Sequence, residues 1–246
     1  MFKFRRRVAW IGAPLLVGAA LVLAWYDVLP GGWTLRGWVT PHAVRRARAQ
    51  AEYAEKRLAS FAEGNRAAPP GSIVWLGSST IERFPLDALF PGHHHLDRGI
   101  GNESAAELLT RLDRSLPDSR PRLVVLYAGS IDFRALGRPP EAIARLARGV
   151  IARVEARYEP RVPVLVIGIL PERDMSAAMV ARLRETNAAL AAVCADEPTR
   201  VFVDTSRPPI VLPDGSLDPS VAADRLHLAE PGYRALADWI RATGLL

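Results

Sequence analysis

Cysteine is almost absent from this chain. The 246 residues include one cysteine, Cys194, which excludes an intrachain disulfide and a cysteine-rich metal site. The run His93, His94 and His95 is the other candidate metal ligand set, but successive residues of an extended segment point to opposite sides, so three neighbours do not converge on one ion. We therefore expect no metal, and an oxidising compartment is permitted but not required.

Two glycine motifs are also incomplete. The segment that starts at Gly99 has Ser104 where a G-x-G-x-x-G motif needs its last glycine, so no dinucleotide cofactor is implied, and we expect no cofactor at all. The segment that starts at Gly77 has Ile81 where a G-x-S-x-G elbow needs glycine, which argues against an α/β-hydrolase proper. Internal repeats and low-complexity tracts are lacking as well.

The body of the chain lacks a charge excess, although the formal net charge is +6. Residues 1–70 contain 11 Lys and Arg against 4 Asp and Glu, and the remainder contains 21 against 22. Basicity that is confined to the amino-terminal arm favours a membrane surface over a nucleic-acid partner. We therefore expect no nucleic acid among the partners.

The amino-terminal arm has the pattern of a membrane anchor. After a basic tail, 1–7, an uncharged stretch runs from Val8 to Tyr26, and its 19 residues would span about 28 Å as a helix, close to the hydrocarbon thickness of a bilayer. We predict a transmembrane anchor at 8–29, a single pass through the inner membrane with the tail in the cytoplasm, and a periplasmic catalytic domain. A cleaved signal peptide is the alternative, since small residues around 22–24 suit cleavage; the length disfavours a buried core helix.

The next segment, 30–70, is predicted to hold a juxtamembrane helix and a linker. Apolar residues between His42 and Glu63 recur at spacings of three and four, which predicts a helix with a thin apolar stripe. We interpret it as a stalk or a strut packed against the domain. The stretch from Gly64 to Gly71 contains two prolines and is read as the linker.

From 71 to 246 the pattern predicts one α/β domain. Apolar strand candidates alternate with segments of helical periodicity, and such alternation requires crossover connections, hence a parallel sheet of about five strands with helices on both faces. The expected strands are 73–76, 94–97, 123–127, 164–169 and 201–203, and the longer helices are 105–115, 140–158, 177–194 and 231–242. In such a sheet, sites form beyond the carboxyl ends of the strands.

Three consecutive hydroxyl residues follow the first strand, and Ser79 is the middle one. At a tight turn into a helix, a serine can present its Oγ above the sheet edge while its backbone N–H joins the unpaired donors of the helix N-terminus. That is a suitable place for a nucleophile. The alternative is that the hydroxyls only cap the helix.

Near the carboxyl end, Asp224 precedes His227 by three residues in a loop that enters the last helix. An aspartate at this spacing can turn its carboxylate onto the imidazole Nδ1–H, which leaves the other ring nitrogen to accept a proton from a serine hydroxyl. A surface loop would also explain the pair, but with Ser79 at the first strand the three residues predict a catalytic triad.

From about Ser72 to the end, the sequence resembles the SGNH (GDSL-like) hydrolase family. Gly77-Ser78-Ser79 corresponds to the Gly-Asp-Ser block, the segments 96–104 and 126–133 resemble the second and third blocks, and the Asp-x-x-His of the last block is present without alteration. The resemblance implies a flavodoxin-like sheet and ester hydrolysis through an acyl-enzyme. Ser79 would then be the nucleophile.

Several positions depart from the family pattern. Ser78 replaces the aspartate of the first block, Asn102 stands at the oxyanion glycine, and Ile131 stands where the third block has an amide-donating asparagine. Losing one such donor typically costs about 10²–10³ in kcat. Asparagine tolerates a left-handed backbone, so Asn102 could keep the glycine's N–H contribution and add its side-chain amide. Alternatively, Asn102 only makes the turn, and the oxyanion hole consists of the backbone amides of Ser79 and Asn102.

These observations predict a membrane-anchored serine esterase. Its substrates would be acetyl groups on envelope polysaccharide or acyl chains of lysophospholipids. Arg83 and Arg134 are expected near the mouth of the site, where they either meet an anionic substrate or are solvated or paired. The rival hypotheses are a catalytically weak binding module for envelope glycans on the same fold, and an acyltransferase.

Overall fold

The computed structural model describes residues 41–246. The predicted tail (1–7) and anchor (8–29) lie outside this range, as does the first part of the segment 30–70. Within it, no helix combines the length and the apolar composition that crossing a bilayer requires. The compact body of the protein is Lys56–Leu246.

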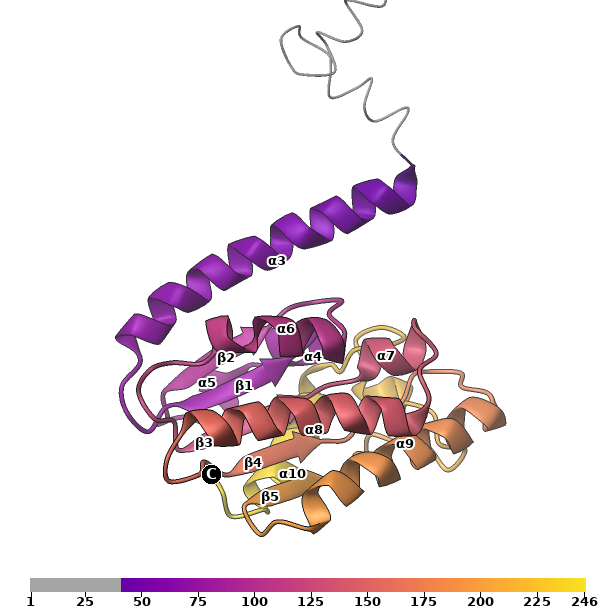
Figure 1. Ribbon diagram of the computed structural model, residues 1–246. Coiled ribbons are helices and arrows are strands. Elements are labelled where there is room, and N and C mark those ends of the chain that lie inside the picture. The colour runs from indigo at the N-terminus through magenta and orange to yellow at the C-terminus, as the bar shows by residue number, and fades with distance from the viewer. Residues whose placement is uncertain (1–40) are drawn as a thin grey trace, which may run out of the picture. The chain divides into compact units, whose positions relative to one another are not determined.

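The body is built on one five-stranded sheet in the order β2-β1-β3-β4-β5, in which every neighbouring pair is parallel (Figure 1). The predicted α/β class and strand number are therefore confirmed. The strands are β1 (Ile73–Gly77), β2 (His95–Gly99), β3 (Leu123–Tyr127), β4 (Val164–Ile167) and β5 (Arg200–Val203). Compared with the predicted ranges 94–97 and 164–169, β2 begins one residue and ends two residues later in the sequence, and β4 ends two residues earlier. The limits of a strand depend on the hydrogen bonds between strands, which the apolar pattern does not report.

Helices cover both faces of this sheet. The long helices of the body, α6 (Ala105–Ser115), α8 (Pro140–Arg157), α9 (Ala177–Ala195) and α10 (Glu230–Arg241), agree with the prediction to within a residue or two. The shorter elements are α4 (Ser79–Glu82), α5 (Leu86–Leu89), α7 (Ser130–Arg134) and the 3₁₀ turn η1 (Pro219–Val221). Strand side chains alternate between two cores: Val74 and Leu76 pack with α6, α8 and α9, whereas Ile73 and Trp75 pack with α5 and α10.

Helix α3 (His42–Ala67) is four residues longer than predicted, so the linker expected from Gly64 is wrong in its first half. Gly64 lies inside the helix, where a Cβ would lie 3.2 Å from the Arg98 Nη2, and that nitrogen donates to the neighbouring Asn65 side chain at 2.8 Å. Toward the end of the helix, Leu58 and Phe61 are buried against the body. The guanidinium groups of Arg57, Arg98 and Arg111 lie over the Phe61 ring, 4.9 to 5.5 Å from its centroid.

The strand order reverses direction between β1 and β3, which opens a crevice at the carboxyl ends of these strands. The turn after β1 is tight, since a Cβ on Gly77 would lie 2.6 Å from the carbonyl oxygen of Tyr127. Only glycine fits at that position. The chain that leaves β1 therefore passes close to β3 before it enters α4.

Candidate active site

Ser79 is the first residue of α4, directly after the turn at the end of β1. Ser78 is the residue that precedes the helix, but its side chain makes no capping hydrogen bond and its Oγ lies 3.2 Å from the Oγ of Ser130 instead. The capping interpretation of these two hydroxyls is therefore not what the structure shows. Ser79 leaves its own Oγ free to face the carboxyl-terminal loop.

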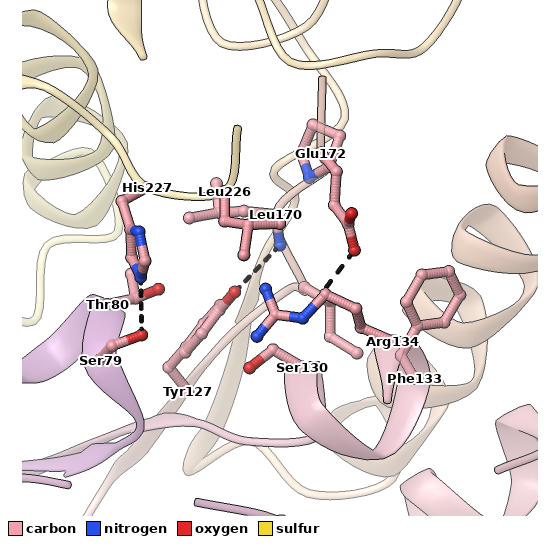
Figure 2. Close-up of a pocket in the computed structure, with 12 residues that line it drawn as sticks. Ser79, Thr80, Tyr127, Ser130, Phe133, Arg134, Leu170, Glu172, Leu226 and His227 are labelled. Atoms are coloured by element: carbon pink, nitrogen blue, oxygen red, sulfur yellow. Dashed lines mark hydrogen bonds and ion pairs between the residues drawn. The ribbon is translucent and has the colours of Figure 1, made fainter. Parts of the chain in front are cut away.

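The structure brings Ser79, His227 and Asp224 into one hydrogen-bonded chain. Ser79 Oγ lies 3.0 Å from His227 Nε2 (Figure 2), and His227 Nδ1 lies 2.7 Å from Asp224 Oδ2. The carboxylate accepts from Nδ1–H, so Nε2 is the nitrogen that can accept the serine proton. This is the arrangement of a nucleophile, a base and an orienting acid.

The Asp224 carboxylate is held in its charged form. Burial alone would raise its pKa, but hydrogen bonds from the Leu226 N–H, the His227 ring and the His227 N–H outweigh that effect and lower the pKa to about 2. The two backbone bonds to Oδ1 measure 2.7 and 2.9 Å. Arg83 Nη1 adds a longer ion pair at 3.7 Å, so Arg83 lies beside the site as predicted.

The loop that carries this pair is fixed on both sides. Two backbone hydrogen bonds of 2.8 Å close it, from Ala223 N–H to His227 and from Ala229 N–H to Val221, and the Arg173 N–H joins it to the loop after β4 by donating to the Arg225 carbonyl. At the start of α10, the Tyr233 hydroxyl donates to the Thr80 carbonyl at 3.0 Å. The helix that begins with Ser79 and the helix that follows the His227 loop are therefore tied together beside the site.

Asn102 has a left-handed backbone, with φ of 61°, as its place at the family's glycine predicted. Its neighbours are firmly held: the Gly101 N–H donates to Glu82 Oε2 at 2.8 Å, and Glu103 forms two 2.6 Å hydrogen bonds with the buried Arg111. A Cβ on Gly101 would lie 3.8 Å from the Ser79 Cβ, so this loop runs beside the nucleophile. The Asn102 side chain is exposed, and its role as an amide donor stays a prediction.

The third block has a structural role in this chain. The Asp132 carboxylate is fully buried and accepts from the Ala105 N–H at 2.7 Å and from Arg138 Nη1 at 2.8 Å. It thereby caps the start of α6 and holds α7 against it. Ile131 is buried beside it and has no polar group to offer.

A small pocket opens in front of Ser79 and His227 (Figure 2). Its polar walls were only partly predicted, since Arg134 was expected there but Tyr127, Ser130 and Glu172 were not. The remaining lining residues are Thr80, Phe133, Ile169, Leu170, Pro171 and Leu226. Glu172 follows β4 at the carboxyl edge of the sheet, and this position was the sequence signal that could have revealed it.

The three consecutive histidines turn to separate partners. The Trp75 Nε1–H donates to His95 Nδ1 at 3.1 Å, so the other ring nitrogen of His95 carries the proton and donates to the Phe90 carbonyl at 2.9 Å. His94 Nδ1 lies 3.2 Å from the Ser72 hydroxyl, and His93 faces an arginine on the surface. They diverge, as alternation along an extended segment requires.

Comparison with known proteins agrees with this geometry. The model of the GDSL-like lipase/acylhydrolase family matches residues 59–235, most of the body. The chain belongs to this family. This membership confirms the resemblance to the SGNH hydrolases. It also supports ester hydrolysis as the class of reaction.

Individual relatives of this GDSL-like chain carry more specific names. It is 30% identical over 166 residues to the platelet-activating factor acetylhydrolase IB subunit alpha1 of Homo sapiens, covering 65% of this chain and 70% of that protein. The same subunit of Bos taurus matches at 30% identity, with 69% of that protein covered.

Solved structures share the fold at lower sequence identity. A GDSL-like lipase of Bacteroides thetaiotaomicron superposes with a TM-score of 0.59 at 18% identity, covering 76% of this chain and 96% of that one. An acetylxylan esterase of Geobacillus stearothermophilus, in a catalytic mutant form, gives 0.52 at 14% identity, with 71% and 94% covered. At these identities the likeness concerns the fold alone.

Proposed function

We propose that this GDSL-like acylhydrolase is a membrane-anchored serine esterase in which Ser79, His227 and Asp224 are the catalytic triad. The observation that carries the proposal is the hydrogen-bonded chain from Ser79 Oγ through the imidazole to the Asp224 carboxylate, with distances of 3.0 and 2.7 Å. Ser79 lies near the start of the domain sequence, and Asp224 and His227 lie near its end. A purely structural role for these residues would not require their side chains to form one hydrogen-bonded chain.

The reaction follows from the positions of these groups. Ser79 Oγ attacks the ester carbonyl while His227 Nε2 takes its proton, and Asp224 stabilises the imidazolium that forms. The backbone N–H groups of Ser79 and Asn102 receive the negative charge on the carbonyl oxygen. The imidazolium then protonates the departing alcohol, and a water molecule that His227 deprotonates releases the acid from the acyl-enzyme.

The oxyanion hole has a weak point at Ile131. An aliphatic side chain cannot donate a hydrogen bond, and one missing donor costs about 10²–10³ in kcat. We propose that this chain works with the two backbone donors, and that a slow turnover number results. Slow hydrolysis that depends on Ser79 would still identify an enzyme. Under the binding-module alternative, any residual ester hydrolysis would be the same without the Ser79 hydroxyl.

We infer that the favoured substrates are acetyl esters, and among them acetyl groups on envelope polysaccharide. Two kinds of support point to a short acyl group. The curated relatives are acetylhydrolases, and the pocket at Ser79 is small and carries hydroxyl and charged groups among its lining residues.

A lysophospholipid is the second candidate. A groove larger than the pocket at Ser79 has Ala223, the chain neighbour of Asp224, in its lining. It combines apolar residues such as Leu89 and Leu228 with Arg83, and these suit an acyl chain beside a phosphate, whereas its second arginine, Arg234, is paired with Glu230. Acyl-chain preference separates the candidates, since the first demands acetyl and the second accepts long chains.

We propose that segment 8–29 anchors the protein in the inner membrane and that the domain faces the periplasm. The supporting observations are the uncharged 19-residue stretch and the basic residues before it. Envelope polysaccharide and lipid would then both lie within reach of the tethered domain.

Turnover of p-nitrophenyl acetate by the full chain in detergent tests the triad. We expect wild-type hydrolysis and a loss of about 10³-fold or more in Ser79→Ala. A Ser206→Ala variant, which changes an exposed serine outside the lining of the pocket, is the matched control and should keep wild-type activity. Equal residual rates in wild type and Ser79→Ala would reject the esterase and favour the binding module.

A further inference from the structure

Glu172 is a buried carboxylate that the fold leaves incompletely satisfied. The residue is 7% exposed and lines the pocket that contains Ser79 and His227. Its Oε1 has no hydrogen-bond partner among residues 41–246. The nearest cations are Arg134 Nε, 3.9 Å from Oε1, and Arg225 Nε, 3.6 Å from Oε2, and both distances exceed those of normal hydrogen bonds.

Other buried carboxylates of the described body have hydrogen-bond partners for both of their oxygens. Glu103 makes two 2.6 Å bonds to Arg111, Asp132 uses both oxygens, and Glu155 makes bonds of 2.7 and 2.8 Å to Arg200. An unpartnered buried acceptor costs free energy and calls for an explanation. Because Glu172 stands in the pocket next to the triad, a bound molecule is the natural partner.

The chemistry of Oε1 restricts that molecule. A carboxylate oxygen only accepts hydrogen bonds, so an anionic group cannot satisfy it, whereas a hydroxyl can. The Arg134 guanidinium, directed toward the same pocket and toward Glu172 (Figure 2), only donates and therefore needs an acceptor. Neighbouring hydroxyls of a sugar ring accept and donate at once, and they match this pair.

We propose that Glu172 and Arg134 form a subsite for the alcohol portion of the ester, and that this portion is a sugar with free hydroxyls beside the acetylated one. The inference rests on the proposed esterase and names its substrate class. Glu172 accepts one hydroxyl, Arg134 donates to a neighbouring oxygen, and the ester carbonyl is thereby placed at Ser79. An alcohol without hydroxyls leaves Oε1 unsatisfied and binds less well.

The test compares two acetyl esters of similar size on the full chain in detergent: a mono-O-acetyl methyl glucoside and cyclohexyl acetate. We expect the wild type to prefer the sugar ester. Glu172→Ala should lower kcat/KM for the sugar ester by about 10- to 100-fold, the usual effect of losing hydrogen bonds to a charged group, mainly through KM. The effect on cyclohexyl acetate should stay within about 3-fold, inside the range of neutral contacts.

Two further variants guard against structural explanations. Glu172→Gln keeps the shape and one acceptor oxygen, so it should retain the thermal midpoint and lose only part of the sugar preference. Glu185→Ala changes an exposed carboxylate on α9 and should leave both esters unaffected. An equal loss on the two esters in Glu172→Ala, or a wild type without preference for the sugar, overturns the subsite.

A second set of measurements distinguishes failure of the proposed triad from failure of the Glu172 subsite. Turnover that persists in Ser79→Ala rejects the triad, whatever Glu172 does. The dissociation constant of the sugar ester from the Ser79→Ala variant, measured by calorimetry, then reports binding at the subsite in the absence of hydrolysis. A dissociation constant that rises about 10-fold or more on adding Glu172→Ala supports the subsite; an unchanged constant overturns it.

Discussion

The charge of Asp224 is set by three hydrogen bonds, and this has a measurable consequence for the pH dependence of the reaction. Because these bonds lower the pKa of Asp224 to about 2, the carboxylate stays ionised throughout the range in which the enzyme can be assayed. Because the pKa of Asp224 is lowered in the folded protein, the stabilising interactions of its carboxylate are fully present above its ordinary pKa. They are lost only as the pH falls toward 2.

We therefore predict that Asp224 contributes no proton uptake to the pH dependence of kcat/KM above about pH 4, because its carboxylate stays ionised there. The measurement is a pH profile with p-nitrophenyl acetate. An acid limb that is present in the wild type and absent from the residual activity of Asp224→Asn would mean that Asp224 is protonated in this range and would contradict the assignment. Asp224→Asn, which removes the charge and keeps the shape, should lower kcat by about 10⁴-fold.

At the residue scale, sequence alone identified the groups with a local signature. Ser79 follows a strand, and Asp224 and His227 share a loop at a fixed spacing, so each was a candidate, and their combination with the family resemblance predicted one site. Asn102 could also be placed in a left-handed turn from its block. Tyr127 had no such signature, and the only signal for Glu172 was its position after a strand, because the tertiary structure decides which of these side chains line the pocket.

Among the elements, α3 reaches the loop of the second block through one arginine. Arg57 donates to the Gly99 carbonyl at 2.8 Å and to Asp97 at 2.9 Å, and its Nε lies 3.6 Å from Glu82 Oε1. Glu82 in turn accepts from the Gly101 N–H at 2.8 Å. Burial raises the pKa of Glu82 above its ordinary value, and the hydrogen bond from the Gly101 N–H opposes part of that rise.

We predict that Glu82→Ala lowers kcat by about 10- to 100-fold with a smaller change in KM, because the Gly101 N–H loses its acceptor and the Asn102 N–H shifts away from the oxyanion. Glu82→Gln keeps an acceptor oxygen and should restore most of the activity. Both variants are assayed with p-nitrophenyl acetate. A kcat in Glu82→Ala equal to that of wild type would show that this loop is positioned by other contacts.

Element order was the most predictable level of the structure. Apolar strands and amphipathic helices alternate clearly, and their limits were off by only a few residues. The error at Gly64 arose because glycine and the prolines after it indicate a break, whereas the helix continues to Ala67 and its last turns contact Arg98. The one-turn helices escaped prediction because four or five residues contain too little periodicity.

For the whole molecule, the basic tail and the uncharged stretch lead to a prediction about its place in the cell. We expect the full chain to sediment with inner membranes and to stay there after an alkaline carbonate wash, because a spanning segment is held by the hydrocarbon layer and not by charge. Protease added to spheroplasts should digest the domain. Release by carbonate would contradict the anchor, and protection from protease would contradict the periplasmic orientation.

Ser79 and His227 are separated by 148 positions along the chain, and for the proposed triad this separation has a consequence during synthesis. Ser79 leaves the ribosome long before His227 does, so a chain that stops before the last loop lacks the proposed base. If the triad is catalytic, we expect hydrolysis only after that loop has packed beside Ser79. The appearance of activity would then report completion of the domain.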